Sequence, residues 1–229
     1  MTHKTSFITA CALLLIAHAT SGVAGKSAQL EALAARAAAG EAAAQFELAM
    51  AYDVGAMGKR DLAQVASWCR KSADQGNADG QNCMGSLHQA GEGVAHDDAE
   101  AVRWYEKAAA QDHGEALTNL GLYYDLGRGV AQDRAKARDL YLRGAEHGSL
   151  NGMFNLGITY KAGTGVPVNP IEAYVWLDLA RFYTQRSNNM QLKWRVRGEL
   201  EELKRTMSKT DIAIAERRVR EWDAAHRPQ

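Results

Sequence analysis

The sequence predicts an all-α fold, a solenoid in which pairs of antiparallel helices stack one after another. Three observations predict it. Motif residues return every 36 positions, glycines stand between the helical segments, and apolar residues within the segments are three and four apart. The chain has 229 residues, of which 46% are hydrophobic and 24% charged, so it has enough apolar material for a core and is not intrinsically disordered.

Residues 1–24 are expected to be a secretory signal peptide. Lys4 precedes an apolar run at 7–19, and the small residues that follow permit cleavage after Ala24. A run of 19 − 6 = 13 residues is shorter than the roughly 20 that cross a bilayer, so no stable membrane span is expected after cleavage. We therefore expect a periplasmic or secreted protein of 229 − 24 = 205 residues. The alternative is an uncleaved signal that anchors the chain.

Four copies of a 36-residue motif follow the signal peptide. A leucine or methionine precedes a small residue, a tyrosine or histidine comes three residues after that small residue, and a glycine comes six after it. The small residues are Ala49, Gly85, Gly121 and Gly157. In this register we predict a leading half-repeat helix at 27–43, repeat 1 at 44–77, repeat 2 at 78–113, repeat 3 at 114–149 and repeat 4 at 150–185.

Each copy is expected to form a helix, a tight glycine turn and a second helix. Glycine inside a helix costs about 1 kcal/mol relative to alanine, so it is expected where its missing Cβ lets a neighbouring helix approach closely. Gly91 and Gly127 begin Gly-x-Gly-Val turns, whereas Met57 replaces the second turn glycine in the first copy, whose turn is expected to differ. The predicted N-cap residues of the second helices are Asp97, Asp133 and Asn169, and Asp61 stands in the same column of the first copy.

Residues 186–229 are expected to form C-terminal capping helices, which close the end of a solenoid with a polar outer face. Apolar residues at steps of 4, 4, 3 and 4 from Leu192 to Met207 predict one amphipathic helix over 188–206, and Ser208 with Asp211 predicts the start of a last helix. The segment has eleven Lys or Arg against seven Asp or Glu. Because both signs alternate, we interpret it as a solvated face; a surface for acidic lipid or nucleic acid is the alternative.

The two cysteines beyond the signal peptide are a candidate disulfide pair. Cys69 and Cys83 lie at equal distances from Gly76, the predicted turn between two antiparallel helices, so they are expected to lie level with each other. An oxidising compartment would permit the bond. Two separate buried thiols are the alternative.

No catalytic site, cofactor or metal site is expected. The chain has no Gly-x-Ser-x-Gly, His-Glu-x-x-His or Ser-x-x-Lys motif, and no Gly-Lys-Ser/Thr follows its turn glycines. Cys83, His88 and His96 do not have the spacing of a standard zinc site. The chain has 27 Lys and Arg against 27 Asp and Glu, a formal net charge of +0, so no nucleic-acid partner is expected.

The repeated pattern resembles the Sel-one-like repeat (SLR) family, a branch of the tetratricopeptide-like helical solenoids. The likeness is best displayed at 80–109 and 116–145 and extends over about 27–185. It implies a right-handed α-solenoid, a TPR/SLR-like superhelix, that acts as a non-catalytic scaffold and binds a protein or peptide on its concave face. The alternative, by analogy with cysteine-rich exported relatives, is a hydrolase acting on cell-wall or β-lactam material.

The similarity to tetratricopeptide packing also implies which positions line the groove. They stand three before, one after and four after the small residue of each copy. These positions are Phe46, Met50, Asp53, Asn82, Ser86, Gln89, Thr118, Leu122, Asp125, Phe154, Ile158 and Lys161.

Overall fold

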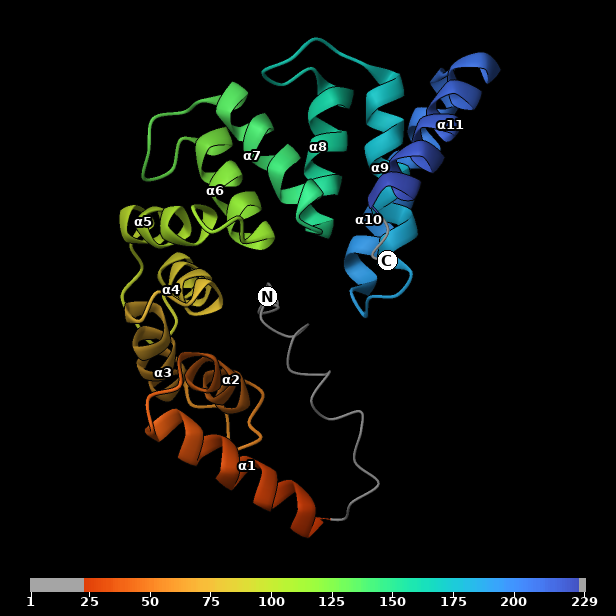
Figure 1. Ribbon diagram of the computed structural model, residues 1–229. Coiled ribbons are helices and arrows are strands. Elements are labelled where there is room, and N and C mark those ends of the chain that lie inside the picture. Colours follow the sequence, from red (N-terminus) through yellow and green to blue (C-terminus); the bar gives the residue numbers. More distant parts are fainter. Residues whose placement is uncertain (1–22, 227–229) are drawn as a thin grey trace. The chain divides into compact units, whose positions relative to one another are not determined.

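The computed structural model describes residues 23–226, which form eleven α-helices and no β-strand (Figure 1). The predicted all-α fold is therefore confirmed. Residues 1–22, which make up most of the predicted signal peptide, lie outside the described residues. Within the described part, every helix is too short or too polar to cross a membrane. The chain divides into two compact units, Met1–His113 and Gly114–Gln229.

The first unit contains a leading helix and two helix pairs. Helices α2 and α3 form one antiparallel pair and α4 and α5 the next, while α3 packs against α4 and α1 packs against α2. The bounds are α1 (Val23–Ala38), α2 (Ala42–Asp53), α3 (Leu62–Asp74), α4 (Ala78–Ala90) and α5 (Asp98–Ala109).

The second unit contains two more pairs, α6 with α7 and α8 with α9, followed by two helices that both pack against α9. The bounds are α6 (Gly114–Leu126), α7 (Arg134–Glu146), α8 (Leu150–Ala162), α9 (Pro170–Thr184), α10 (Met190–Thr206) and α11 (Lys209–His226).

The second helix of each pair begins at a side-chain cap. The carboxylate of Asp61 accepts hydrogen bonds from the backbone N–H groups of residues 63 and 64, and Asp97 does the same one repeat later. Asp133 and Asn169 each accept one bond, from the N–H groups of residues 136 and 172. These bonds satisfy backbone donors that have no partner within the helix. The three predicted N-caps are confirmed, and Asp61 caps the equivalent helix of the first copy.

The turn that precedes these caps depends on two glycines in left-handed conformation. Gly91 has a φ of 68° and ends α4, and Gly93 has a φ of 70°. A Cβ on Gly93 would lie 2.2 Å from the carbonyl oxygen of Leu62 at the start of α3, so this glycine is also needed for close approach. In the first copy, Met57 is half-buried against an apolar cluster of α1 and α2, formed by Ala37, Ala44, Leu48 and Ala51. The glycine that follows it, Gly58, has a positive φ of 112°. The expected difference in this turn is confirmed.

The two helices of each pair make their closest contact at the small-residue column. A Cβ on Gly85 would lie 2.5 Å from a ring carbon of Tyr105, which is well inside van der Waals contact. A Cβ on Gly121 would lie 2.8 Å from a ring carbon of Tyr141. Glycine is therefore the residue that lets a buried aromatic ring lie directly on the helix backbone.

The first copy reverses these sizes. Ala49 carries a Cβ where the later copies have glycine, and the residue equivalent to Tyr105 is Cys69. Both Ala49 and Cys69 are fully buried in one apolar cluster. A smaller side chain on the second helix thus accommodates the methyl group on the first, and the combined volume stays within what the core accepts.

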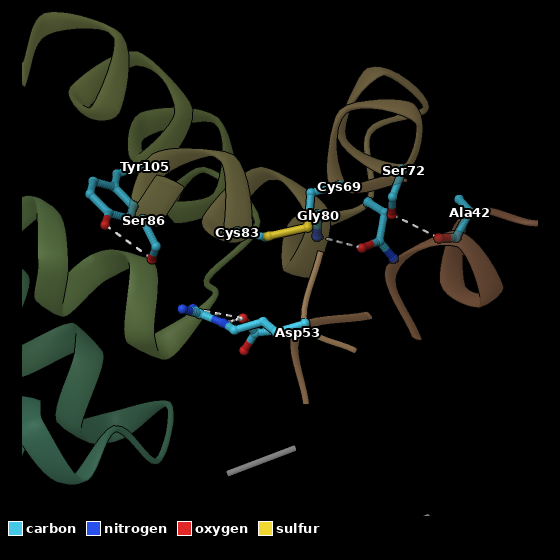
Figure 2. Close-up of a disulfide and its surroundings, with 10 residues drawn as sticks. Ala42, Asp53, Cys69, Ser72, Gly80, Cys83, Ser86 and Tyr105 are labelled. Atoms are coloured by element: carbon cyan, nitrogen blue, oxygen red, sulfur yellow. Dashed lines mark hydrogen bonds and ion pairs between the residues drawn. A yellow bond between two sulfur atoms is a disulfide. The ribbon is translucent and has the colours of Figure 1, made fainter. Parts of the chain in front are cut away.

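Cys69 on α3 and Cys83 on α4 form a disulfide, with their Cα atoms 6.0 Å apart (Figure 2). Figure 2 shows a second close approach of the same two helices at Gly80, where an added Cβ would lie 2.6 Å from Ser72 Oγ. The Ser72 hydroxyl in turn donates a 2.7 Å hydrogen bond to the carbonyl of Ala42. The junction between repeats 1 and 2 is therefore fixed covalently as well as by packing.

The C-terminal helices complete the core of the second unit. Leu192, Val196, Leu200 and Leu203 form the buried stripe of α10, as their spacing predicts. On α11, the Trp222 ring packs edge-on against Trp176 with ring centres 5.8 Å apart. Ser208 accepts a hydrogen bond from the N–H of residue 211 and so caps the start of α11.

We predict that Gly85→Ala destabilises the first unit by about 1–3 kcal/mol in chemical denaturation, although alanine is the better helix former. The added methyl group would overlap the Tyr105 ring. Gly198→Ala is the matched control, because nothing lies within 4 Å of a Cβ at this helical glycine. It should stabilise the second unit by up to about 1 kcal/mol. Equal effects of the two substitutions would contradict the close contact.

We predict that unreduced protein has a mass lower than reduced protein by two hydrogen atoms. Because the bond closes a loop with a sequence separation of 14, its loss should cost about 3 kcal/mol of stability. The double variant Cys69→Ala, Cys83→Ala should have the same stability as wild-type protein measured with a reductant. A stability that the reductant leaves unchanged would contradict this prediction.

Candidate functional site

The described surface of the second unit has a hollow between α6, α8 and α10, which we call the α8 hollow. Its volume is about 210 Å³ and it is open to solvent. Side chains from α7 and from the turn after α8 complete it. The lining residues are Leu122, Asp125, Tyr141, Phe154, Asn155, Ile158, Thr159, Thr164, Arg195 and Glu199.

Four of the predicted groove residues meet in the α8 hollow. Leu122 and Asp125 come from α6, and Phe154 and Ile158 come from α8. Phe154 is 3% exposed, so it forms the base of the hollow, whereas Leu122 and Ile158 are half-buried. The repeat register therefore brings equivalent positions of two successive first helices to one surface.

Arg195 on α10 supplies the cationic side of the hollow. Its guanidinium group lies 4.4 Å from the centre of the Phe154 ring, a cation–π contact. Within residues 23–226, no carboxylate lies at ion-pair distance from Arg195. The planar fork of donors is therefore held over an apolar surface and remains open to an acceptor from outside the chain.

The acidic side of the hollow is already compensated within the chain. Glu199 accepts a 2.7 Å hydrogen bond from the ammonium group of Lys161, and Glu202 accepts one of 2.8 Å. Burial lowers the pKa of Lys161, but these two carboxylates raise it by more, so its net pKa lies above the usual value. The hydrogen bond from Lys161 lowers the pKa of Glu202. Lys161, also a predicted groove residue, thus links α8 to α10.

Tyr141 contributes a hydroxyl group at the hollow. Burial, together with the charge of Asp125, raises its pKa, so the phenol stays protonated at neutral pH and can donate a hydrogen bond. Within the described residues this hydroxyl has no hydrogen-bond partner. Its equivalent, the Tyr105 hydroxyl, donates a 2.6 Å bond to Gln89. It also lies 3.2 Å from Ser86 Oγ (Figure 2).

In the first unit the predicted groove positions are mostly occupied by contacts within the chain. Ser86 and Gln89 bond with Tyr105, as described above. Asp53 is buried and accepts a 3.0 Å bond from Arg60, which also pairs with Glu92. Phe46 and Asn82 are half-buried.

The structure differs from the expected open face at four of the twelve positions. Met50, Asp53, Thr118 and Phe154 are buried. Thr118 donates to Ser149 Oγ and to the carbonyl of Gly114, because the close approach of glycine backbones draws it into the helix packing. Met50 belongs to the apolar cluster around the disulfide. Buried positions thus occur three before, one after and four after the small residue, wherever a neighbouring segment is close.

The repeat register does not predict the contribution of α10 to the hollow. Arg195 and Glu199 are four residues apart beside the stripe of Leu192 and Val196, so they flank the buried face of an amphipathic helix. This spacing was available in the sequence. What was missing was the packing of α10 on α8, which depends on a long-range contact.

The residues considered for zinc are engaged otherwise. Cys83 is in the disulfide, and the His96 ring donates to the carbonyl of His88 at 3.1 Å. In residues 23–226, no three His, Cys, Asp or Glu side chains are placed to hold a metal ion.

Comparisons with known proteins agree with the repeat architecture. The family model of the Sel1 repeat matches residues 42–77, 78–113, 114–149 and 150–181. The crystal structure of c5321, a protective antigen of uropathogenic Escherichia coli with an SLR fold, is 31% identical, with a TM-score of 0.63 over 76% of this chain. This chain spans 40% of that antigen's length. A Sel1 repeat protein from Oxalobacter formigenes is 28% identical, with a TM-score of 0.62, over 77% of this chain and 79% of its own.

A search of curated proteins gave no significant match. Sel1 repeat proteins are commonly protein–protein interaction scaffolds and are generally non-catalytic. The four successive matches cover more than half of the residues, and they coincide with the helix pairs that close on the small-residue column. The chain belongs to the Sel1 repeat family.

Proposed function

We propose that this chain is an exported, non-catalytic scaffold that binds a protein or peptide partner, and that the α8 hollow receives a side chain of that partner. One observation carries the proposal. The hollow has an apolar base and holds two hydrogen-bond donors. Within the described residues, the Arg195 guanidinium has no carboxylate at ion-pair distance, and the Tyr141 hydroxyl has no hydrogen-bond partner. The Tyr141 side chain is buried and the Arg195 guanidinium is exposed beside it, so both donors can be satisfied by an acceptor supplied by a ligand.

The size of the hollow favours a side chain over a small-molecule substrate. Pockets for small molecules generally measure about 300–1,000 Å³. The α8 hollow measures about 210 Å³. It is therefore suited to one anchoring side chain of a larger partner that covers the surrounding surface.

The lining also defines the chemistry of the anchor. Phe154, Leu122 and Ile158 accept an apolar side chain, and Arg195 directly beside them accepts a carboxylate. We infer that the partner presents a large apolar residue next to an acidic group. Arginine and aromatic residues are also the side chains that most often dominate the free energy of protein interfaces.

The lining does not favour the alternative, a hydrolase for cell-wall or β-lactam material. It contains no serine, cysteine or histidine for a nucleophile–base pair. Its two carboxylates, Asp125 and Glu199, are each paired with a cation of the chain, Arg134 and Lys161 respectively. The proposal of a binding scaffold therefore needs fewer assumptions.

The proposed export is supported by the cysteine chemistry and by the predicted signal peptide. Disulfides persist in the periplasm and outside the cell and are rare in the reducing cytosol. The Cys69–Cys83 bond joins two buried side chains of the core, so it has a structural rather than a catalytic position.

We predict that a photo-crosslinking residue in place of Ile158 yields a discrete covalent adduct in cells that produce the chain. Adding Arg195→Glu should reduce the adduct by about 30-fold, because losing a dominant interface arginine costs about 2 kcal/mol. Arg195 is exposed, so the substitution should leave the helicity and the unfolding midpoint unchanged.

The matched control places the same crosslinker at Arg217, an exposed position on α11. The Ile158 adduct should be missing there. An identical adduct from both positions, or an adduct at Ile158 that Arg195→Glu leaves intact, would rule out the α8 hollow as the anchor site.

We predict that envelope-derived protein begins at Gly25, as N-terminal sequencing or an intact mass would show. Blocking cleavage by Ala24→Leu should retain the chain in the membrane fraction. A mature protein that begins at Met1 would instead support the membrane-anchored alternative.

A further inference from the structure

The end of α9 and the start of α10 carry three large exposed apolar side chains near a run of basic residues. Trp194 is 67% exposed, Met190 57% and Phe182 41%. Phe182 lies near the end of α9, and the other two lie in the first turns of α10. Isolated exposed apolar residues are ordinary, but three large ones at the same end of a helical hairpin require an explanation.

Met190, Trp194 and Arg197 share one face of α10. They are spaced at i, i+4 and i+7, and the buried residues Leu192 and Val196 lie on the opposite face. The apolar tips therefore point away from the core of the second unit. Because α10 is fixed to α8 and α9 by its buried stripe, these side chains are presented on a rigid element.

The charged residues of the chain segment that carries these side chains are all basic. From residue 181 to residue 197 the chain has five Lys or Arg and no Asp or Glu. Arg181 pairs with Asp178, and Arg195 belongs to the α8 hollow. Within the described residues, Arg186, Lys193 and Arg197 have no carboxylate at ion-pair distance. Glu201 is the first acid on the Met190 face, about two turns beyond Trp194.

We propose that Arg186, Met190, Lys193, Trp194 and Arg197, together called the hairpin patch, dock the protein on an anionic lipid surface. Tryptophan favours the boundary between head groups and acyl chains, where its ring is apolar and its N–H is hydrated. Three cations beside it would bind anionic head groups, and reversible attachment of a peripheral protein needs both kinds of contact. A nucleic-acid surface would use the cations but would leave Met190 and Phe182 exposed without a role. The proposal is independent of the α8 hollow.

The test measures the emission of Trp194 in the full chain. The signal is the difference between the fluorescence of wild type and of Trp194→Phe, because the chain has five tryptophans. With vesicles of equal parts phosphatidylglycerol and phosphatidylcholine, the Trp194 emission should shift to the blue and should be quenched by lipids brominated near the head group. This difference isolates the emission of Trp194 from that of the other four tryptophans.

Removing charge should weaken the attachment by a known factor. Arg186→Gln with Arg197→Gln should lower the partition coefficient about 25-fold, or about fivefold for each charge. The matched control, Arg217→Gln with Arg220→Gln, removes the same charge from exposed positions on α11 and should leave the Trp194 signal unchanged.

Three outcomes would overturn the proposal. The first is an unchanged Trp194 emission with anionic vesicles, and the second is an equal response to vesicles of phosphatidylcholine alone. The third is a Trp194 shift without lipid, caused either by a single-stranded oligonucleotide or by a higher protein concentration, which would assign the patch to nucleic acid or to a second copy of the chain.

Discussion

The contact on which the repeats depend is the meeting of a glycine in the first helix with a large side chain from the second helix. At Gly85 a methyl group would overlap Tyr105, and at Gly157 it would lie 2.7 Å from Leu177 Cγ. The helix loses about 1 kcal/mol of propensity at each glycine, while a fully buried Tyr or Leu side chain contributes about 1.5–3 kcal/mol. The packing term is the larger, so a residue that weakens an isolated helix stabilises the pair.

The two units satisfy their remaining buried groups differently. In the first unit, Gln45 and Gln81 are buried 36 residues apart, and each donates to a backbone carbonyl at the end of the preceding helix. Each also accepts a bond from a second glutamine, Gln75 or Gln111. In the second unit, the positions equivalent to Gln45 and Gln81 are the buried residues Leu117 and Met153. Hydrogen bonds therefore supplement the packing in the first unit, whereas apolar contacts replace them in the second.

Features that repeat with the period could be predicted from the sequence, and features that depend on one long-range contact could not. The N-caps and the close-contact glycines follow from local chemistry, which is the same in each copy. The exposure of a groove position depends on how close the next helix comes. Thr118 is buried because Gly144 and Gly152 allow backbones to approach it, and this depends on two other segments. The place of Arg195 depends on the packing of α10 against α8, which no repeat period describes.

The α8 hollow arises where the third copy departs from the second. In the second copy, the hydroxyl of Tyr105 is satisfied by Ser86 and Gln89. The equivalent positions in the third copy are Leu122 and Asp125, so the tyrosine ring keeps its packing role on the glycine while its hydroxyl loses both neutral partners. The scaffold tolerates this exchange because its stability rests on the ring and the glycine rather than on the hydroxyl. Binding chemistry can therefore change at the helix surface without altering the contact that holds each pair together.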